Sequence, residues 1–234
     1  MNDLSEYNPY DPPRAPVGTA SGDGGQGKRR KSKHIEGSPW LAIWTRPRST
    51  IRTIVDTSPT QGFVVLATCY GVGKVLDRLA NNPRSVDMST GVLFGTAAVG
   101  GLFGGVFGLY LLGSLFEKTG QWLGGRADAQ EVRAALAWGS VPSLVTLAFT
   151  ILMIIAFGTQ IDRAAKPILL AYFACVIVFG IWTSITTVEC IGEVQRFSFL
   201  KAFGSIVLGS VVFVGAILLL VLLVVLASAA LKAT

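Results

Sequence analysis

Apolar runs alternate along the chain with short polar segments in the manner of a protein that crosses a membrane several times. Four long runs contain no charged residue: 88–116, 134–161, 167–188 and 202–231. A helix rises about 1.5 Å per residue, so about 20 apolar residues cross the roughly 30 Å hydrocarbon core of a bilayer. Each run is long enough, and none offers the charged face that a soluble helix needs. The pattern predicts an all-α, polytopic helical membrane bundle.

A fifth span is predicted ahead of these four. Its apolar part, 62–73, is short, and Lys74, Asp77 and Arg78 interrupt the residues that follow. The span becomes long enough if it continues to Ala80, with Lys74 extending toward the far interface. Loop charges satisfy the positive-inside tendency with five spans or with four, and both place the N-terminus in the cytoplasm. We therefore expect a domain of residues 59–234 with five transmembrane helices at about 60–80, 89–116, 133–157, 167–190 and 202–231, the third kinked at Pro142.

Two further segments precede the spans, and the first is a tail. Residues 1–38 are rich in Gly, Pro, Asp and Ser and have almost no aliphatic side chains, which predicts a disordered cytoplasmic tail. A basic cluster near its end could indicate nucleic-acid binding or nuclear localisation. Beside membrane spans, we favour attraction to anionic lipid at the cytoplasmic face, with no nucleic-acid partner. The cluster consists of Lys28, Arg29, Arg30, Lys31 and Lys33.

The second segment, residues 39–58, is predicted to be a helical collar lying at the membrane interface. Trp40, Ile43 and Trp44 fall on one side of a short helix, and tryptophan rings favour the headgroup zone. A second helix then presents apolar residues on one face and Arg48 and Arg52 on another. This arrangement is typical of an interfacial amphipathic helix.

Glycines form a stripe within the predicted second span. Gly100, Gly104 and Gly108 recur at four-residue spacing and so lie on one helix face. In lipid, small residues allow backbones to approach closely, and van der Waals contact then drives helix association. The stripe predicts packing against another span of the same chain, with the seam of a homo-oligomer as the alternative.

Composition and charge exclude several classes of function. The chain of 234 residues is 51% hydrophobic and 15% charged, with a net charge of +6, and nine of its 20 basic residues precede the first apolar run. Its one histidine, His34, lies in the tail, so the usual general acid–base and metal-ligating group is missing from the spans. The three cysteines show no paired spacing. We expect no enzyme activity, no cofactor and no metal.

Two carboxylates near the inner end of the fourth span are the strongest candidates for a functional site. Glu189 and Glu193 lie four residues apart on one helix face, where like charges repel and require cations nearby. The functional interpretation is an ion or proton path, and the alternative, which we favour, is a structural network of ion pairs. The expected arginine partners are Arg126 and Arg133 from the second loop or Arg48 and Arg52 from the collar.

Three sequence segments resemble one family. Residues 38–56, SPWLAIWTRPRSTIRTIVD, are similar to the opening segment of bacterial Yip-domain membrane proteins. Residues 123–126, LGGR, and 132–142 resemble the passage into the family's third span, and 197–202, FSFLKA, resemble the loop before its last span. The resemblance covers about residues 38–230. It implies a five-span helical bundle with a cytoplasmic N-terminus.

The eukaryotic branch of that family is associated with Rab-type GTPases and with ER–Golgi traffic. This chain lacks the Asp-Leu-Tyr-Gly-Pro motif of that branch, which argues against GTPase binding and favours the bacterial branch. We therefore expect a multi-pass protein of the cell (inner) membrane, or of the ER or Golgi membrane if its source is eukaryotic. The predicted function is a membrane scaffold that binds proteins or lipid at its cytoplasmic face. The alternative is a small permeation pathway or transporter for ions, solutes or lipid.

Overall fold

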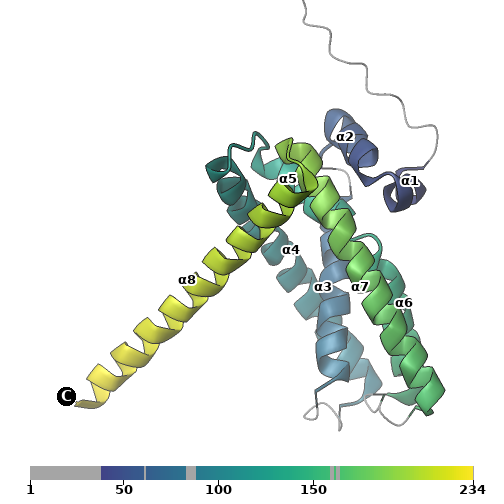
Figure 1. Ribbon diagram of the computed structural model, residues 1–234. Helices are drawn as coiled ribbons and strands as arrows, with labels where there is room; N and C mark the ends of the chain where they lie inside the picture. The colour runs from purple at the N-terminus through teal and green to yellow at the C-terminus, as the bar shows by residue number, and fades with distance from the viewer. Residues whose placement is uncertain (1–37, 61, 83–87, 159–160, 162–163, 234) are drawn as a thin grey trace, which may run out of the picture. The chain divides into compact units, whose positions relative to one another are not determined.

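The computed structural model describes residues 38–60, 62–82, 88–158, 161 and 164–233, within one compact unit of residues 32–234. The predicted tail, apart from Ser38, and its basic cluster lie outside the described residues. Every regular element in the described part of the chain is a helix, which confirms the all-α class. The helices are α1 (Pro39–Thr45), α2 (Pro47–Thr57), α3 (Phe63–Ala80), α4 (Thr90–Trp122), α5 (Ala129–Gly139), α6 (Ser143–Phe157), α7 (Lys166–Gln195) and α8 (Phe199–Ala233) (Figure 1).

Length and apolar composition allow three of these helices to cross a membrane: α4, α7 and α8, the last over Phe199–Ser228. The pair α5 and α6 makes a fourth span if the two are counted together. α3, the expected first span, is not among them, since its 18 residues include Lys74, Asp77 and Arg78. The structure thus supports three to four spans by these criteria, against the five expected.

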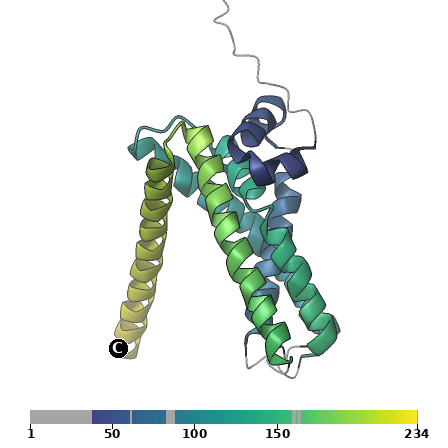
Figure 2. The ribbon, with the colours of Figure 1, turned by 45° about the vertical axis from the view of Figure 1, so that its right-hand side comes forward.

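The predicted third span is divided into two helices. α5 and α6 meet at Ser140–Pro142 with a bend of 48°. Pro142 has no N–H to donate, so a continuous helix would lose a backbone hydrogen bond there. A tight turn replaces it, in which Ser143 N donates to Ser140 O at 2.9 Å. The kink expected at Pro142 is confirmed, and it lets α5 contact α2 while α6 runs beside α7 (Figure 2).

α3 and α4 make the closest helix crossing in the described part of the chain, through glycines. A Cβ atom added at Gly71 would lie 2.8 Å from the Cα of Gly105, and one added at Gly101 would lie 2.5 Å from the Cα of Val72. Backbone thus contacts backbone with no room for a side chain, the kind of contact by which small residues join helices in membranes.

The glycine stripe predicted for this role faces elsewhere. A Cβ atom at Gly104 or Gly108 would meet nothing within 4 Å, and one at Gly100 would touch only Val75. The contact with α3 uses the neighbouring stripe of Gly101 and Gly105, because one residue along a helix rotates the face by about 100°. The prediction of a glycine contact therefore identified the right helix and the wrong face.

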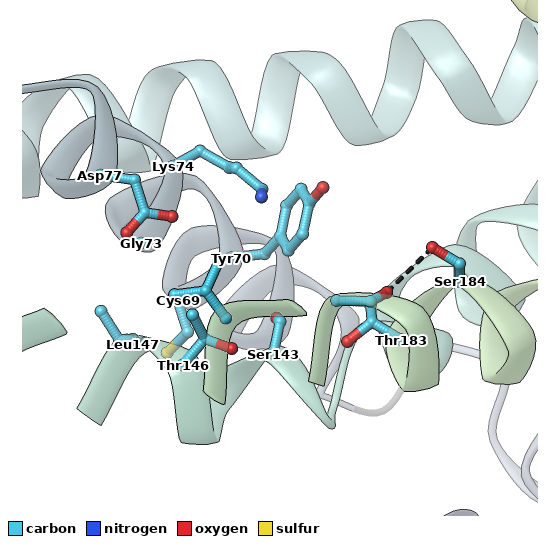
Figure 3. A pocket seen from close by; sticks show the side chains of 12 residues that line it. Cys69, Tyr70, Gly73, Lys74, Asp77, Ser143, Thr146, Leu147, Thr183 and Ser184 are labelled. Atoms are coloured by element: carbon cyan, nitrogen blue, oxygen red, sulfur yellow. Dashed lines mark hydrogen bonds between the residues drawn. The ribbon is translucent and has the colours of Figure 1, made fainter. Parts of the chain in front are cut away.

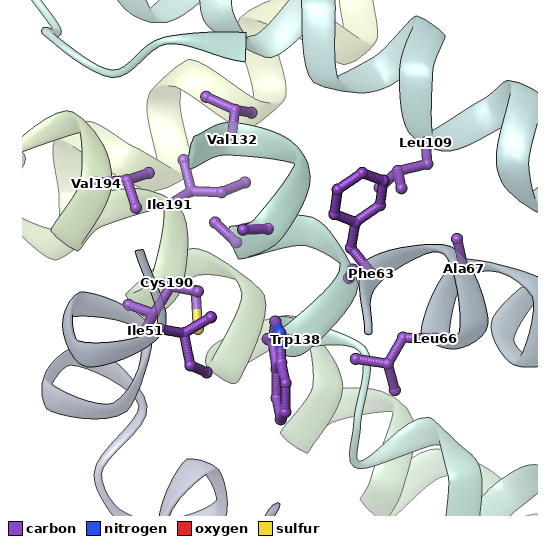
Figure 4. Packing of buried hydrophobic residues seen from close by; sticks show 14 of the residues in the cluster. Ile51, Phe63, Leu66, Ala67, Leu109, Val132, Trp138, Cys190, Ile191 and Val194 are labelled. Carbon is purple, nitrogen blue, oxygen red and sulfur yellow. The ribbon is translucent and has the colours of Figure 1, made fainter. Parts of the chain in front are cut away.

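The collar, α1 and α2, packs into the main hydrophobic core. Ile43 and Ile51 are completely buried, and Ile51 lies beside Cys190 of α7 in a cluster that also contains Trp138 of α5 (Figure 4). Burying a side chain of this size contributes about 1.5–3 kcal/mol. The collar is therefore fixed to the bundle by its own apolar face.

α8 presents aliphatic side chains all round. The 18-residue window that qualifies it as a span is 0% buried by the rest of the chain. Contacts with α4 and α7 lie toward its N-terminal part, where Ala202, Ser205 and Gly209 are buried. A helix that is apolar on every side and uncovered by protein is suited to a lipid environment.

Candidate functional site

Two arginines of the collar pair with the two candidate carboxylates of α7. Arg48 Nε donates to Glu189 Oε2. Arg52 donates to Glu193 Oε1 through Nε at 3.0 Å and through Nη2 at 2.7 Å. We call these four residues the Arg–Glu clamp. Arg48 and Arg52 are four residues apart on α2, and Glu189 and Glu193 are four residues apart on α7. One helical turn of positive charge therefore faces one helical turn of negative charge.

The clamp is half-buried. The glutamate side chains are 24% and 25% exposed, and the arginine side chains 39% and 37%. Partial removal from water strengthens the attraction between the charges, while leaving one partner unpaired would strand a charge. The arrangement neutralises both carboxylates in place, and it joins segments that are 141 residues apart in sequence.

The end of α7 is shaped by the residues that follow the clamp. Arg196 adopts a left-handed conformation with φ of 59°, and Phe197 N donates to Gly192 O at 2.6 Å. This bond closes the helix in the manner of a Schellman motif. Gly192 is buried between the clamp and α8, since a Cβ there would lie 3.5 Å from Arg48 Nη2 and 3.2 Å from Ala202 Cβ.

The other two arginines considered as partners lie elsewhere. The guanidinium of Arg133 stacks over the Tyr110 ring, with 4.4 Å between Cζ and the ring centroid, and its Nη2 donates to Ser114 Oγ at 3.4 Å. Arg133 is thus directed from α5 to α4. Arg126 is exposed in the loop before α5. The collar arginines take both carboxylates because α2, rather than this loop, packs on that face of α7.

Gln195, which the sequence did not single out, fixes the loop between α4 and α5 to the same end of α7. Its side chain is 1% exposed, accepts a hydrogen bond from Ala127 N at 3.4 Å and donates to Phe116 O at 3.3 Å. A Cβ at Gly120 or Gly125 would overlap with the Gln195 carboxamide. Gly125, in the LGGR segment, is the signal that sequence reasoning could have used, since paired glycines directly after a helix predict a close backbone approach.

The collar tryptophans contact aromatic side chains of the bundle. Trp40 lies 5.0 Å from Trp138 of α5, and Trp44 lies 6.2 Å from Phe179 of α7, measured between ring centroids. Trp40 remains 45% exposed. The rings therefore combine protein packing with an uncovered edge, as aromatic side chains do at membrane interfaces.

Two adjoining pockets lie deeper in the bundle. The polar pocket, of about 190 Å³, lies between α3, α6 and α7 and is lined by Tyr70, Lys74, Asp77, Ser143, Thr183 and Ser184, among others (Figure 3). The apolar groove, of about 460 Å³, lies between α3, α4, α5 and α7 and is lined by Lys74, Arg78, Gly104, Gly108, Leu109 and Leu112, among others. Tyr70, Lys74 and Thr183 line both. The stripe Gly100, Gly104 and Gly108 thus forms part of a wall of the groove.

A chain of hydrogen bonds connects three helices beside the polar pocket. Thr150 Oγ1 donates to Asp77 Oδ1 at 2.9 Å and lies 3.2 Å from Tyr172 Oη. Thr150 is completely buried and Tyr172 is 4% exposed. The carboxylate of α3 is therefore held by α6, and α6 by α7.

Lys74 has a different environment from Asp77. Its side chain is exposed, and its Nζ lies 5.4 Å from the centroid of the Tyr70 ring. No ion pair of Lys74 or Arg78 occurs among the described residues. An exposed ionisable side chain that lines a pocket is a candidate functional group, and the three charges that interrupt an apolar run are its signal in the sequence.

The described residues include no group of three or more His, Cys, Asp or Glu placed to hold a metal ion. Cys190 is completely buried in the core cluster, whereas Cys69 is half-buried and lines the polar pocket.

Comparison with known proteins places the chain in a family. Neither the curated proteins nor the solved structures yielded a match. The model of the Yip1 domain matches residues 41–229, which include the collar from Leu41 onward, both pockets and most of α8. That family consists of non-enzymatic membrane proteins, and the match confirms the resemblance, though not the bacterial branch. The chain belongs to the Yip1 domain family.

Proposed function

We propose that this protein is a non-catalytic scaffold of the membrane, with the collar as a platform for protein partners on the cytoplasmic side. The observation that carries the proposal is the Arg–Glu clamp. Together with buried Ile43 and Ile51, it holds two short helices against the end of α7. A preorganised surface binds partners without the entropic cost of ordering it.

The basic residues of the collar and of the segment before it indicate on which side of the membrane the platform lies. Arg46, Arg48 and Arg52 lie in the collar, and five more basic residues precede it at 28–33. Short basic segments beside membrane spans stay on the cytoplasmic side and are attracted to anionic lipid. The collar would then lie at the inner interface, with Trp40 at headgroup level.

The proposal includes α3 as a fifth span. Its 18 residues extend about 27 Å at 1.5 Å per residue, close to the thickness of the hydrocarbon core. Its charges have places within such a bundle, since Asp77 accepts a hydrogen bond from Thr150 and Arg78 lies in the last turn. The close glycine crossing with α4, which is itself long enough to span, supports the same depth for both helices.

A permeation pathway or transporter is the second candidate, and the polar pocket is the observation that favours it. Lys74, Asp77 and several hydroxyl side chains line this pocket at a depth where polar groups often mark substrate paths. Glu189 and Glu193 line neither of the two pockets described above. Because the clamp and the polar pocket do not share residues, a continuous polar path along α7 lacks support.

Reconstituted protein tests the choice between the two functions. The full chain in proteoliposomes is assayed for flux of protons, potassium ions and fluorescent lipid. A scaffold gives rates equal to those of protein-free vesicles. Flux that Lys74→Gln abolishes would replace the scaffold with the transporter.

A photo-crosslinking amino acid at exposed Arg46 tests the platform directly in cells. Crosslinks to specific proteins are expected, lost in Glu193→Arg and regained when Arg52→Glu is added. A crosslinker at Asn81, at the opposite end of α3, is the matched control. Crosslinks at Arg46 that are unchanged in Glu193→Arg would contradict the role of the clamp.

A further inference from the structure

The polar pocket and the apolar groove adjoin each other at Lys74. Lys74 lines both, and Arg78, one helical turn further along α3, lines the apolar groove. Both cations are exposed and lack an ion pair among the described residues, in a helix whose third charged residue is Asp77. A cation at membrane depth is costly unless an anion or water meets it. The wall of the groove beyond them is mostly apolar, with glycine, aliphatic and aromatic side chains and a few hydroxyl groups.

We propose that the polar pocket and the apolar groove together bind one phospholipid with a primary ammonium headgroup. Lys74 and Arg78 engage its phosphate, Asp77 engages its ammonium group, and an acyl chain lies in the groove along Gly104 and Gly108. This role uses neither the collar nor the clamp, and it rests on the part of the proposed function that places α3 in the membrane.

The chemistry of the lining residues selects this occupant. Lys74 and Arg78 are four residues apart on one face of α3, so both can reach one phosphate group. One oxygen of the Asp77 carboxylate has no hydrogen-bond partner among the described residues, because the hydrogen bond from Thr150 goes to Oδ1. A purely anionic headgroup would be repelled by that carboxylate, whereas a zwitterion satisfies both signs.

The apolar groove matches the remaining part of such a molecule. Its volume of about 460 Å³ falls within the range of small-molecule sites. Gly104 and Gly108 leave open space, since a Cβ atom at either position would meet nothing within 4 Å. Tyr70, Lys74 and Thr183 border both pockets, so a headgroup in one and a chain in the other would lie next to each other.

Binding is measured by fluorescence polarisation with the full chain in detergent and phosphatidylethanolamine carrying a fluorescent acyl chain. We expect saturable binding that unlabelled phosphatidylethanolamine displaces. Lys74→Gln should weaken binding at least about tenfold, as expected for loss of a charged hydrogen bond, while Lys74→Arg should retain it. Gly104→Leu should weaken it by filling the groove. Gly95→Leu is the matched control, since its Cβ also meets nothing within 4 Å and it lines neither pocket.

Competitors separate the possible sources of the signal. Inorganic phosphate or free phosphoethanolamine that competes as well as the whole lipid would overturn the proposal and leave a site for small anions. Diacylglycerol or phosphatidylglycerol that competes equally well would overturn the headgroup assignment. Binding that is unchanged in both Lys74→Gln and Gly104→Leu would place the lipid elsewhere on the protein. Asp77→Asn should abolish the preference for phosphatidylethanolamine over phosphatidylglycerol.

Discussion

Arg52 donates two hydrogen bonds to the same carboxylate oxygen of Glu193, at 3.0 Å from Nε and 2.7 Å from Nη2. Its Nη2 also lies 3.4 Å from the backbone oxygen of Glu193, so the guanidinium contacts both the side chain and the end of α7. Lysine could not reproduce this geometry, since its ammonium group is a single point of charge. The first predictions concern this pair and its neighbour.

Reversing the charge of one clamp residue should release the collar. Glu193→Arg places a third cation beside Arg48 and Arg52, and we expect a loss of about 1–3 kcal/mol, between the values for exposed and buried pairs. Hydrogen exchange of the α2 amides should accelerate in the variant. The double variant Arg52→Glu with Glu193→Arg should recover much of the protection. Arg126→Glu, in the exposed loop, is the control, and equal acceleration there would remove the argument for a specific pair.

Glu189 and Arg48 should respond unequally to neutralisation. Glu189→Gln keeps a hydrogen-bonding side chain opposite Arg48, whereas Arg48→Ala leaves the half-buried carboxylate of Glu189 without its partner. We therefore expect the alanine variant to lower the midpoint of thermal unfolding more than the glutamine variant does. A larger effect of Glu189→Gln would contradict the ion-pair interpretation.

The crossing of α3 and α4 should not tolerate a methyl group. In Gly105→Ala, the added Cβ meets the backbone of Ala67, which cannot move aside without separating the helices. Overpacking of this kind costs about 1–3 kcal/mol. Thermal unfolding in detergent measures it, with Gly104→Ala on the next helix face as the control. Equal stability of the two variants would indicate that the helices do not cross at this point.

Loss of the Gln195 side chain should free the loop between α4 and α5. Gln195→Leu leaves the buried Ala127 N–H without its partner and removes one of the donors to Phe116 C=O, at a cost of about 1–3 kcal/mol. Protease cleavage within 123–128 should become faster. Gln121→Leu, which removes only an exposed bond to Glu117, should leave the cleavage rate unchanged.

Cysteine labelling should place the two ends of α3 on opposite sides of the membrane. Asn81→Cys is expected to react with a membrane-impermeant maleimide added outside intact cells, and Ser58→Cys only after permeabilisation. Ser198→Cys, between α7 and α8, should behave as Ser58→Cys does. Labelling of positions 58 and 81 from the same side would mean that α3 does not cross.

The helices and their apolar character could be predicted from the sequence, because the length of an apolar run and the position of a proline affect the backbone only within a few residues. The kink at Pro142 could be predicted for the same reason. Which face of α4 packs against another helix is harder to predict. Gly100 and Gly101 have similar neighbours in the sequence, and only the position of α3 decides that Gly101 is the one in backbone contact.

Contacts between residues far apart in the sequence were even harder to predict. Nothing near Glu193 distinguishes Arg52 from Arg133, and the choice depends on which element packs against α7. Gln195 was missed because a buried amide leaves no charge pattern. Lys74 and Asp77 were visible in the sequence, but their pockets exist only when α3, α6 and α7 are assembled.

The short helix α5 and the turn that follows it contact both the collar and the apolar groove. Trp138 packs against Trp40 of the collar, while Ala137 and Ser140 line the apolar groove. A protein seated on the collar and a molecule seated in the groove would therefore contact side chains of the same eleven-residue helix or of the turn that directly follows it. The 48° bend at Ser140–Pro142 sets that helix apart from α6, which lines the polar pocket and not the groove.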